Sequence, residues 1–157
     1  MSASGPHRSG GGTRRRGRAL AMKLLYQVEL GGQPLESVCR NYEEYASAPE
    51  KIRDFALELA RGVTERKEEL DAAIKEALDN WDFDRLAAVD KQLLRAAAFE
   101  LIHLEDIPAK VTINEAIELS REYSTENSAG FVNGVLDNLL SRRAAHKKEG
   151  TGTQLKS

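Results

Sequence analysis

Four arginines within five positions are the clearest candidates for chemistry in this sequence. They fall in the stretch TRRRGRALAMKLLY (13–26) as Arg14, Arg15, Arg16 and Arg18. The planar guanidinium group binds two phosphate oxygens at once, so such a cluster is typical of an arm that contacts nucleic acid. In a helix, Arg14 and Arg18 share a face while the other two project elsewhere, so no single stripe forms. We expect Gly17 to loosen the junction between this arm and the helix. A solubilising flank explains the composition equally well, and both interpretations stay open at this point.

The stretch TENSAGFVNG (125–134) is the second candidate site. Here Phe131 stands at the start of an apolar helical run, where an aromatic ring can stack on a base. Asn127, Ser128 and the free backbone N–H groups of the helix start can meet phosphate. The alternative is that Phe131 packs in the core, at the edge of the stripe formed by Val132 and Leu136.

No catalytic or metal-binding motif is present. The sequence has no HExxH, CxxC, glycine-rich phosphate loop or nucleophile elbow, and its three histidines are far apart. The single cysteine, Cys39, excludes an internal disulfide and a cysteine-built metal site, and it indicates a reducing, cytoplasmic setting. The sequence therefore predicts a protein that is not an enzyme and that holds neither cofactor nor metal.

Charge is strongly segregated along the chain. Residues 1–28 carry six basic side chains and no acidic one, and residues 142–157 carry five basic side chains against Glu149. The segment between them, 29–141, has 12 basic and 24 acidic residues and thus a net charge of −12. This pattern predicts a polyanion as partner of the ends and a basic protein as partner of the body. No apolar run approaches the ~18 residues of a membrane span, so no membrane contact is predicted.

Nearly the whole chain has helical periodicity, and no period-2 run predicts a strand. The predicted helices cover 15–30, 34–47, 49–78, a short piece near 84–88, a helix from Asp90 to about 104, 112–123 and 127–142. Gly31-Gly32 ends the first helix, Gly62 can bend the third, and Trp81 and Phe83 mark a connecting segment. We expect one all-α domain over 14–142, a disordered Gly/Ser/Arg-rich leader over 1–13 and a disordered basic tail over 143–157.

Two helix starts have local capping signals. Asp90 can cap the helix that carries Leu94 and Leu101. Thr112 and Glu115 have the spacing of a capping box, which would start the next helix at Thr112.

Four stretches together carry a resemblance to a known family. In chain order they are RRRGRALAMKLLY, VDKQLLRAAAFEL, IPAKVTINEAIELSREY and FVNGVLDNL, and they span about 14–140. The chain resembles the NusB family of bacterial transcription antitermination factors. The resemblance implies an all-α fold of about seven helices in two packed subdomains and no catalysis. It also implies a complex with the ribosomal protein NusE that binds single-stranded boxA RNA of nascent ribosomal transcripts, within an antitermination complex with RNA polymerase. Family members can form homodimers when free.

The resemblance also assigns residues by position. The implied RNA contacts are Arg14, Arg15, Arg16, Arg18, Asn127 and Phe131. The implied contacts to NusE are Tyr26, Asp84 and Asp90. The family often has an acid at the place of Asn127, so asparagine removes a negative charge beside RNA. It often has Glu at the place of Asp90, so an ion pair with NusE and a plain helix cap are both open for this residue; for Tyr26, core packing and RNA contact are open as well.

Two other function classes fit parts of the pattern. Similar helical domains occur fused to ribosomal-RNA methyltransferases, where they act as targeting modules, but 157 residues leave no room for a catalytic domain beside this one. A protein-binding scaffold with basic ends that touch nothing specific is the third class. Replacing the four arginines by alanine would separate it from an RNA-binding factor.

Overall fold

The first helix is long, and α4 (Glu50–Glu65) and α6 (Ala88–His103) pack against it. The computed structural model describes residues 5–79 and 82–156, and within these ranges it is helical without strands, as the sequence predicts. Helix α1 (Gly5–Gly31) is followed by Gly32, whose φ of 67° lies in the left-handed region that glycine adopts without a steric penalty. Leu20, Ala21 and Leu24 of α1 are buried, because they recur on one side of the helix.

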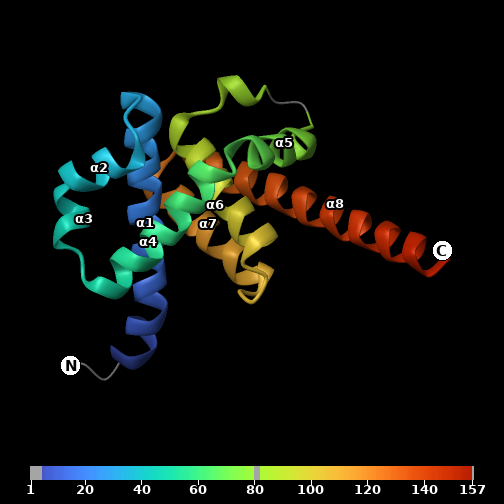
Figure 1. Ribbon diagram of the computed structural model, residues 1–157, viewed down its shortest axis with the longest axis horizontal. Coiled ribbons are helices and arrows are strands. Elements are labelled where there is room, and N and C mark those ends of the chain that lie inside the picture. The colour runs from blue at the N-terminus through green and yellow to red at the C-terminus, as the bar shows by residue number, and fades with distance from the viewer. Residues whose placement is uncertain (1–4, 80–81, 157) are drawn as a thin grey trace.

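The remaining helices form two groups around α1 and α6 (Figure 1). The first group contains α2 (Leu35–Asn41), α3 (Glu43–Ser47) and α4 (Glu50–Glu65), with α4 packed along α1. The second contains α5 (Lys67–Ala77), the 3₁₀ helix η1 (Phe83–Arg85), α6 (Ala88–His103), α7 (Ala109–Tyr123) and α8 (Ser128–Lys156). Since α6 contacts both α1 and α4, one continuous core joins the two groups.

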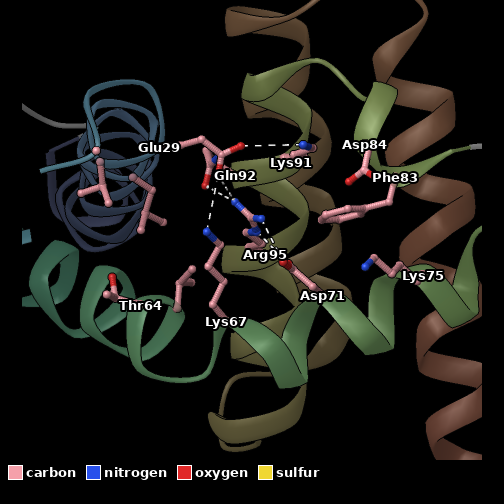
Figure 2. Close-up of a pocket in the computed structure, with 14 residues that line it drawn as sticks. Glu29, Thr64, Lys67, Asp71, Lys75, Phe83, Asp84, Lys91, Gln92 and Arg95 are labelled. Atoms are coloured by element: carbon pink, nitrogen blue, oxygen red, sulfur yellow. Dashed lines mark hydrogen bonds and ion pairs between the residues drawn. The ribbon is translucent and has the colours of Figure 1, made fainter. Parts of the chain in front are cut away.

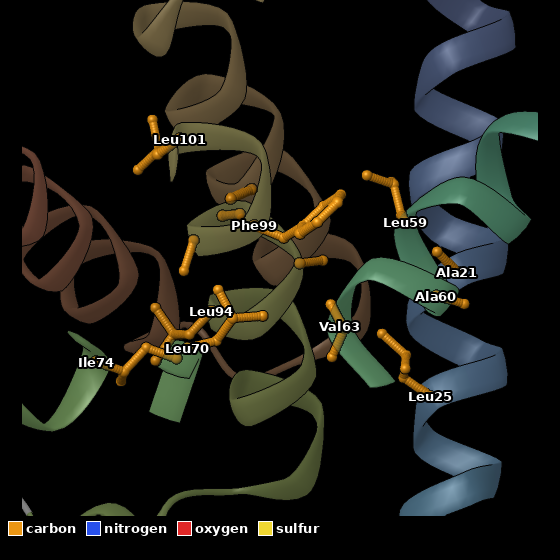
Figure 3. Close-up of a cluster of buried hydrophobic side chains, with 14 of the residues drawn as sticks. Ala21, Leu25, Leu59, Ala60, Val63, Leu70, Ile74, Leu94, Phe99 and Leu101 are labelled. Carbon is orange, nitrogen blue, oxygen red and sulfur yellow. The ribbon is translucent and has the colours of Figure 1, made fainter. Parts of the chain in front are cut away.

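The core lies where α4, α5 and α6 meet (Figure 3). Leu59 of α4, Leu70 of α5 and Leu94 of α6 have no exposed surface. Each such side chain contributes roughly 1.5–3 kcal/mol by its transfer from water. Helix α6 is buried on all sides from Gln92 to Ile102, which makes it the central helix of the domain.

Gly62 has a different role from the predicted bend. Helix α4 runs through Gly62, and the break comes four residues later at Arg66, where φ is −118° and ψ is 25°. A Cβ atom at Gly62 would lie 2.2 Å from Cζ of Phe99. The glycine is therefore the contact surface on which the Phe99 ring packs between α4 and α6.

Several predicted element boundaries were wrong. The helix predicted over 34–47 is divided at Tyr42, whose φ of −100° and ψ of 107° are extended. The helix predicted over 49–78 is divided at Arg66 into α4 and α5. The short piece near 84–88 is instead the 3₁₀ turn of η1. Of the two aromatics that mark the connecting segment, Trp81 lies outside the described residues.

Both predicted caps were also wrong, because each helix begins earlier than its polar residue. Helix α6 begins at Ala88, so Asp90 is inside its first turn. Helix α7 begins at Ala109, directly after the extended backbone of Pro108, so Thr112 is one turn inside the helix. The side chains of Asp90, Thr112 and Glu115 are thereby available for tertiary contacts.

The leader and tail predicted as disordered over 1–13 and 143–157 stay predictions, and the described helices extend into both segments. Helix α1 begins at Gly5 and α8 ends at Lys156, while residues 1–4 and 157 lie outside the described residues. Near the C-terminus, His146 lies 3.5 Å from a Glu76 oxygen and Lys147 pairs with Glu105. These contacts hold α8 against the domain beyond Arg142.

Candidate nucleic-acid interface

The four arginines lie on α1, and the helix directs them to different surroundings. Arg16 is exposed and forms no ion pair or hydrogen bond within the described residues. Arg14 is exposed, and its guanidinium carbon lies 5.0 Å from the centre of the Phe55 ring of α4. The guanidinium carbon of Arg18 also lies over the Phe55 ring, 5.4 Å from its centre. Arg14 and Arg18 share this neighbour because residues four apart lie on the same face of a helix.

Arg15 is held by α7. Its Nε and Nη2 atoms each donate a 2.8 Å hydrogen bond to the Glu115 carboxylate, while the arginine side chain remains 52% exposed. The hydrogen bonds and charge of Arg15 lower the pKa of the Glu115 carboxyl below its ordinary value. An exposed pair of this kind contributes about 0–1 kcal/mol, so a phosphate can compete for Arg15 at small cost.

Arg18 is a core residue. Its side chain is 6% exposed and donates two 2.8 Å hydrogen bonds to Glu100 of α6, which is 2% exposed. The Thr112 hydroxyl of α7 donates a third bond of 2.8 Å to the same carboxylate. Arg18 is therefore almost completely enclosed by protein and has very little surface to offer to RNA.

Gly17 allows α1 to approach α4, and it is not a loosening point. It lies inside α1, and a Cβ atom there would be 2.9 Å from Cδ2 of Phe55 and 3.3 Å from the Ile52 carbonyl oxygen. The part of α1 that carries the four arginines is thus packed against α4.

The loop before α8 and the start of α6 enclose a pocket of about 520 Å³, which we call the Asp90 pocket. Its lining residues are Asp82, Arg85, Leu86, Ala87, Asp90, Thr125, Asn127, Ser128 and Phe131. Phe131 is half-buried: it packs against the core and also forms a wall of the pocket. The two interpretations of this ring, core packing and an accessible aromatic face, are therefore compatible.

Asp90 is buried in this pocket, with 8% of its surface exposed. Its Oδ2 atom accepts a 3.1 Å hydrogen bond from the Ser128 hydroxyl, whereas its Oδ1 atom has no partner among the described residues. The hydroxyls of Ser124 and Thr125 lie 2.8 and 3.0 Å from the Ser128 oxygen. A buried carboxylate oxygen without a donor is costly, so the pocket is complementary to a ligand that donates hydrogen bonds or carries positive charge.

The other two residues assigned to a partner lie outside this pocket. Asp84 is exposed on η1 and lines a second pocket, which is described below. Tyr26 is half-exposed on α1. The structure thus brings Asn127, Phe131 and Asp90 together, with Asp84 two residues from the pocket-lining Asp82 on the same short turn.

The described residues contain no group of three or more His, Cys, Asp or Glu side chains that could hold a metal ion. None of their helices is long and apolar enough to cross a membrane.

Comparison with known proteins decides the family. The model of the NusB family matches residues 15–141, which is most of the chain. The chain belongs to the NusB family. The match begins at Arg15 in α1 and ends about halfway along α8, so it includes Arg15, Arg16 and Arg18 and the whole Asp90 pocket, while Arg14 lies one residue before it.

Relatives named transcription antitermination protein NusB match over nearly their full length. The protein of Clostridium novyi is 38% identical over 129 residues, covering 81% of this chain and 97% of the relative. The protein of Desulfitobacterium hafniense is 38% identical over 142 residues, covering 89% of this chain and 95% of the relative.

Solved structures of NusB proteins share the fold. NusB of T. maritima is 38% identical, with a TM-score of 0.73 over 82% of this chain and 90% of that one. A crystal structure of antitermination factors NusB and NusE in complex with double-stranded RNA gives a TM-score of 0.76 at 27% identity, covering 83% of this chain and 97% of that one. The predicted all-α NusB fold is confirmed.

Sequence reasoning missed the partners of the arginines. Glu100 and Thr112 belong to helices that are far from Arg18 in the chain. The sequence feature that could have indicated a buried ion pair is the acidic Glu100 within the apolar run FELI. Ser128 was noted as a candidate for phosphate, but its hydroxyl bonds to Asp90.

Proposed function

We propose that this chain is a transcription antitermination factor that binds boxA RNA of nascent ribosomal transcripts together with NusE. In this role it would promote processive transcription of ribosomal RNA operons within a complex that includes RNA polymerase, and it would act in the cytoplasm without catalysing a reaction. The observation that carries the proposal is the Asp90 pocket, where an aromatic wall and a carboxylate with one oxygen lacking a donor among the described residues lie in a chain of the NusB family.

The RNA contacts we propose are Arg14, Arg15, Arg16, Asn127 and Phe131. Arg18 is left out, because its guanidinium is enclosed by Glu100 and the helices around it. Arg14 and Arg16 have no carboxylate partner among the described residues, and Arg15 can exchange Glu115 for phosphate. Stacking of a base on Phe131 would add about 1–3 kcal/mol.

The contacts we propose to NusE are Tyr26, Asp84 and Asp90. A basic ribosomal protein suits the net charge of −12 on residues 29–141. A cationic side chain of NusE that reaches the Asp90 pocket would supply the donor that Oδ1 lacks.

The test of RNA binding is a salt titration with a boxA RNA and a scrambled RNA, with and without NusE. Each phosphate contact to single-stranded RNA contributes roughly −0.7 to the log–log salt slope. The double variant Arg14→Ala/Arg16→Ala should therefore make the slope less steep by about 1.4. Arg40→Ala/Arg61→Ala, which removes two exposed arginines of α2 and α4, is the matched control and should leave it unchanged.

Equal affinity for both RNAs under every condition would reduce the proposal to non-specific electrostatics. For the protein partner, Asp84→Lys should weaken NusE binding, whereas Asp54→Lys, at another exposed site, on α4, should not. An equal loss in both variants would show that only overall charge matters.

A further inference from the structure

A second pocket, of about 530 Å³, lies between the end of α1, the α4–α5 junction, η1 and α6 (Figure 2). We call it the Gln92 pocket. Its charged lining residues are the cations Lys67, Lys75, Lys91 and Arg95 and the carboxylates Glu29, Asp71 and Asp84. None of the cations belongs to the RNA or NusE contacts proposed above.

Arg95 forms hydrogen-bonded ion pairs with two of the carboxylates, which leaves a net charge of −1 on these three side chains. The Arg95 guanidinium donates to Asp71 at 2.7 and 3.0 Å and to Glu29 at 2.6 Å. Burial disfavours the charged form of Glu29, but the hydrogen bond and charge of Arg95, with the charges of Lys91 and Lys67, outweigh it and lower the pKa of this carboxyl. Glu29 is therefore an ionised partner of Arg95.

The lysines of the pocket make no such close contacts with carboxylates. The Nζ atoms of Lys91 and Lys67 lie 3.8 and 3.9 Å from Glu29, which is beyond hydrogen-bond length. Lys75 forms no ion pair in the described part of the chain. The Nζ atoms of Lys75 and Lys91 lie 5.3 and 5.0 Å from the centre of the Phe83 ring, so both ammonium groups line the pocket next to this ring (Figure 2).

Gln92 adds a neutral donor to the same pocket. Its side chain is 1% exposed, and its Oε1 atom accepts a 3.3 Å hydrogen bond from Arg95. Because arginine only donates, this bond fixes which end of the amide is oxygen. The Nε2 group then has no acceptor among the described residues. A buried N–H donor without an acceptor is costly, so a ligand that brings an acceptor to this atom would be favoured.

We propose that the Gln92 pocket binds a phosphate group, with Gln92, Lys75 and Lys91 as its donors. Three donors on separate side chains suit a phosphate, which has more acceptor oxygens than a carboxylate. The volume exceeds what one phosphate fills, so the group can belong to a nucleotide or to an RNA backbone as well as to a free ion. Asp84 is at the exposed rim, where its repulsion of an anion is screened by water.

The test is a titration of the full chain, labelled with ¹⁵N, with inorganic pyrophosphate. The side-chain NH₂ signals of Gln92 should shift and saturate, because the amide gains an acceptor. Lys75→Gln should weaken pyrophosphate binding about five-fold, as expected for loss of one exposed charge contact. Lys51→Gln removes an exposed lysine of α4 and is the control.

Two results would overturn the proposal: Gln92 signals that do not move, or equal weakening by the two lysine variants. A second titration, with a single-stranded RNA that lacks boxA, identifies the source of the phosphate. A saturable shift of the same signals assigns an RNA backbone, and a shift with pyrophosphate alone assigns a small phosphate ligand. Since boxA affinity is measured separately, this proposal and the proposed function can fail independently.

Discussion

The buried pair of Arg18 and Glu100 gives the sharpest test of the structure, because the sequence assigned Arg18 to RNA. Replacing Arg18 by Met keeps most of the side-chain volume but leaves the Glu100 carboxylate, 2% exposed, with only the Thr112 hydroxyl as donor. Breaking one side of a buried ion pair costs about 3–5 kcal/mol. With a urea m-value of about 2 kcal/mol/M, the midpoint of unfolding should fall by about 1.5–2.5 M.

The assay is urea unfolding at neutral pH, followed by circular dichroism. Arg121→Ala removes an exposed partner of Glu118 and is the control, with an expected change below about 0.5 kcal/mol. The combined variant Arg18→Met/Glu100→Leu/Thr112→Val removes all polar groups of the cluster, so it should recover most of the lost stability.

A loss below about 1 kcal/mol in Arg18→Met, with an unchanged m-value, would refute the buried pair. An Arg18→Met variant that is fully stable yet loses boxA affinity would return Arg18 to the RNA-binding residues.

Two further outcomes follow from the packing and the charges. Gly62→Ala should lower the free energy of unfolding by about 1–3 kcal/mol, because the new Cβ would lie 2.2 Å from the Phe99 ring. Gly134→Ala, where the new Cβ would meet no atom within 4 Å, should instead stabilise α8 by about 0.5–1 kcal/mol. Thermal unfolding compares the two variants, and equal effects would contradict the contact between Gly62 and Phe99. The lowered pKa of Glu115 means that its pair with Arg15 contributes stability above the ordinary value of 4.5, which is lost as the pH falls through the lowered pKa. The stability difference between wild type and Arg15→Ala should therefore close in acid, and a difference that persists at pH 2 would contradict this assignment.

The sequence was sufficient for the fold class and for most of the core. Apolar periodicity predicted the buried faces of α1, α4 and α6, since this signal depends only on neighbours within a few residues. The break at Arg66 was not predictable in this way, because the apolar pattern continues from Val63 to Leu70 across it.

Contacts between distant helices could not be predicted from local pattern. Arg18 and Glu100 are 82 positions apart, so nothing near either residue shows that the two charges meet. Asp90 was predicted as a cap from its position before an apolar run, but its side chain bonds to Ser128, 38 positions later. Residue types and local spacing were sufficient to select the candidate site residues. The side chains that each of them contacts depend on the tertiary structure.

The chain of hydroxyls from Ser124 and Thr125 through Ser128 to Asp90 joins the turn before α8 to the first turn of α6. Two walls of the pocket are thereby set in position before anything enters it. A ligand that bridges Phe131 and Asp90 then meets a rigid receptor, and the entropy of ordering a loop is not subtracted from its affinity. Encounter, and not refolding of the turn, would set the rate at which the two associate.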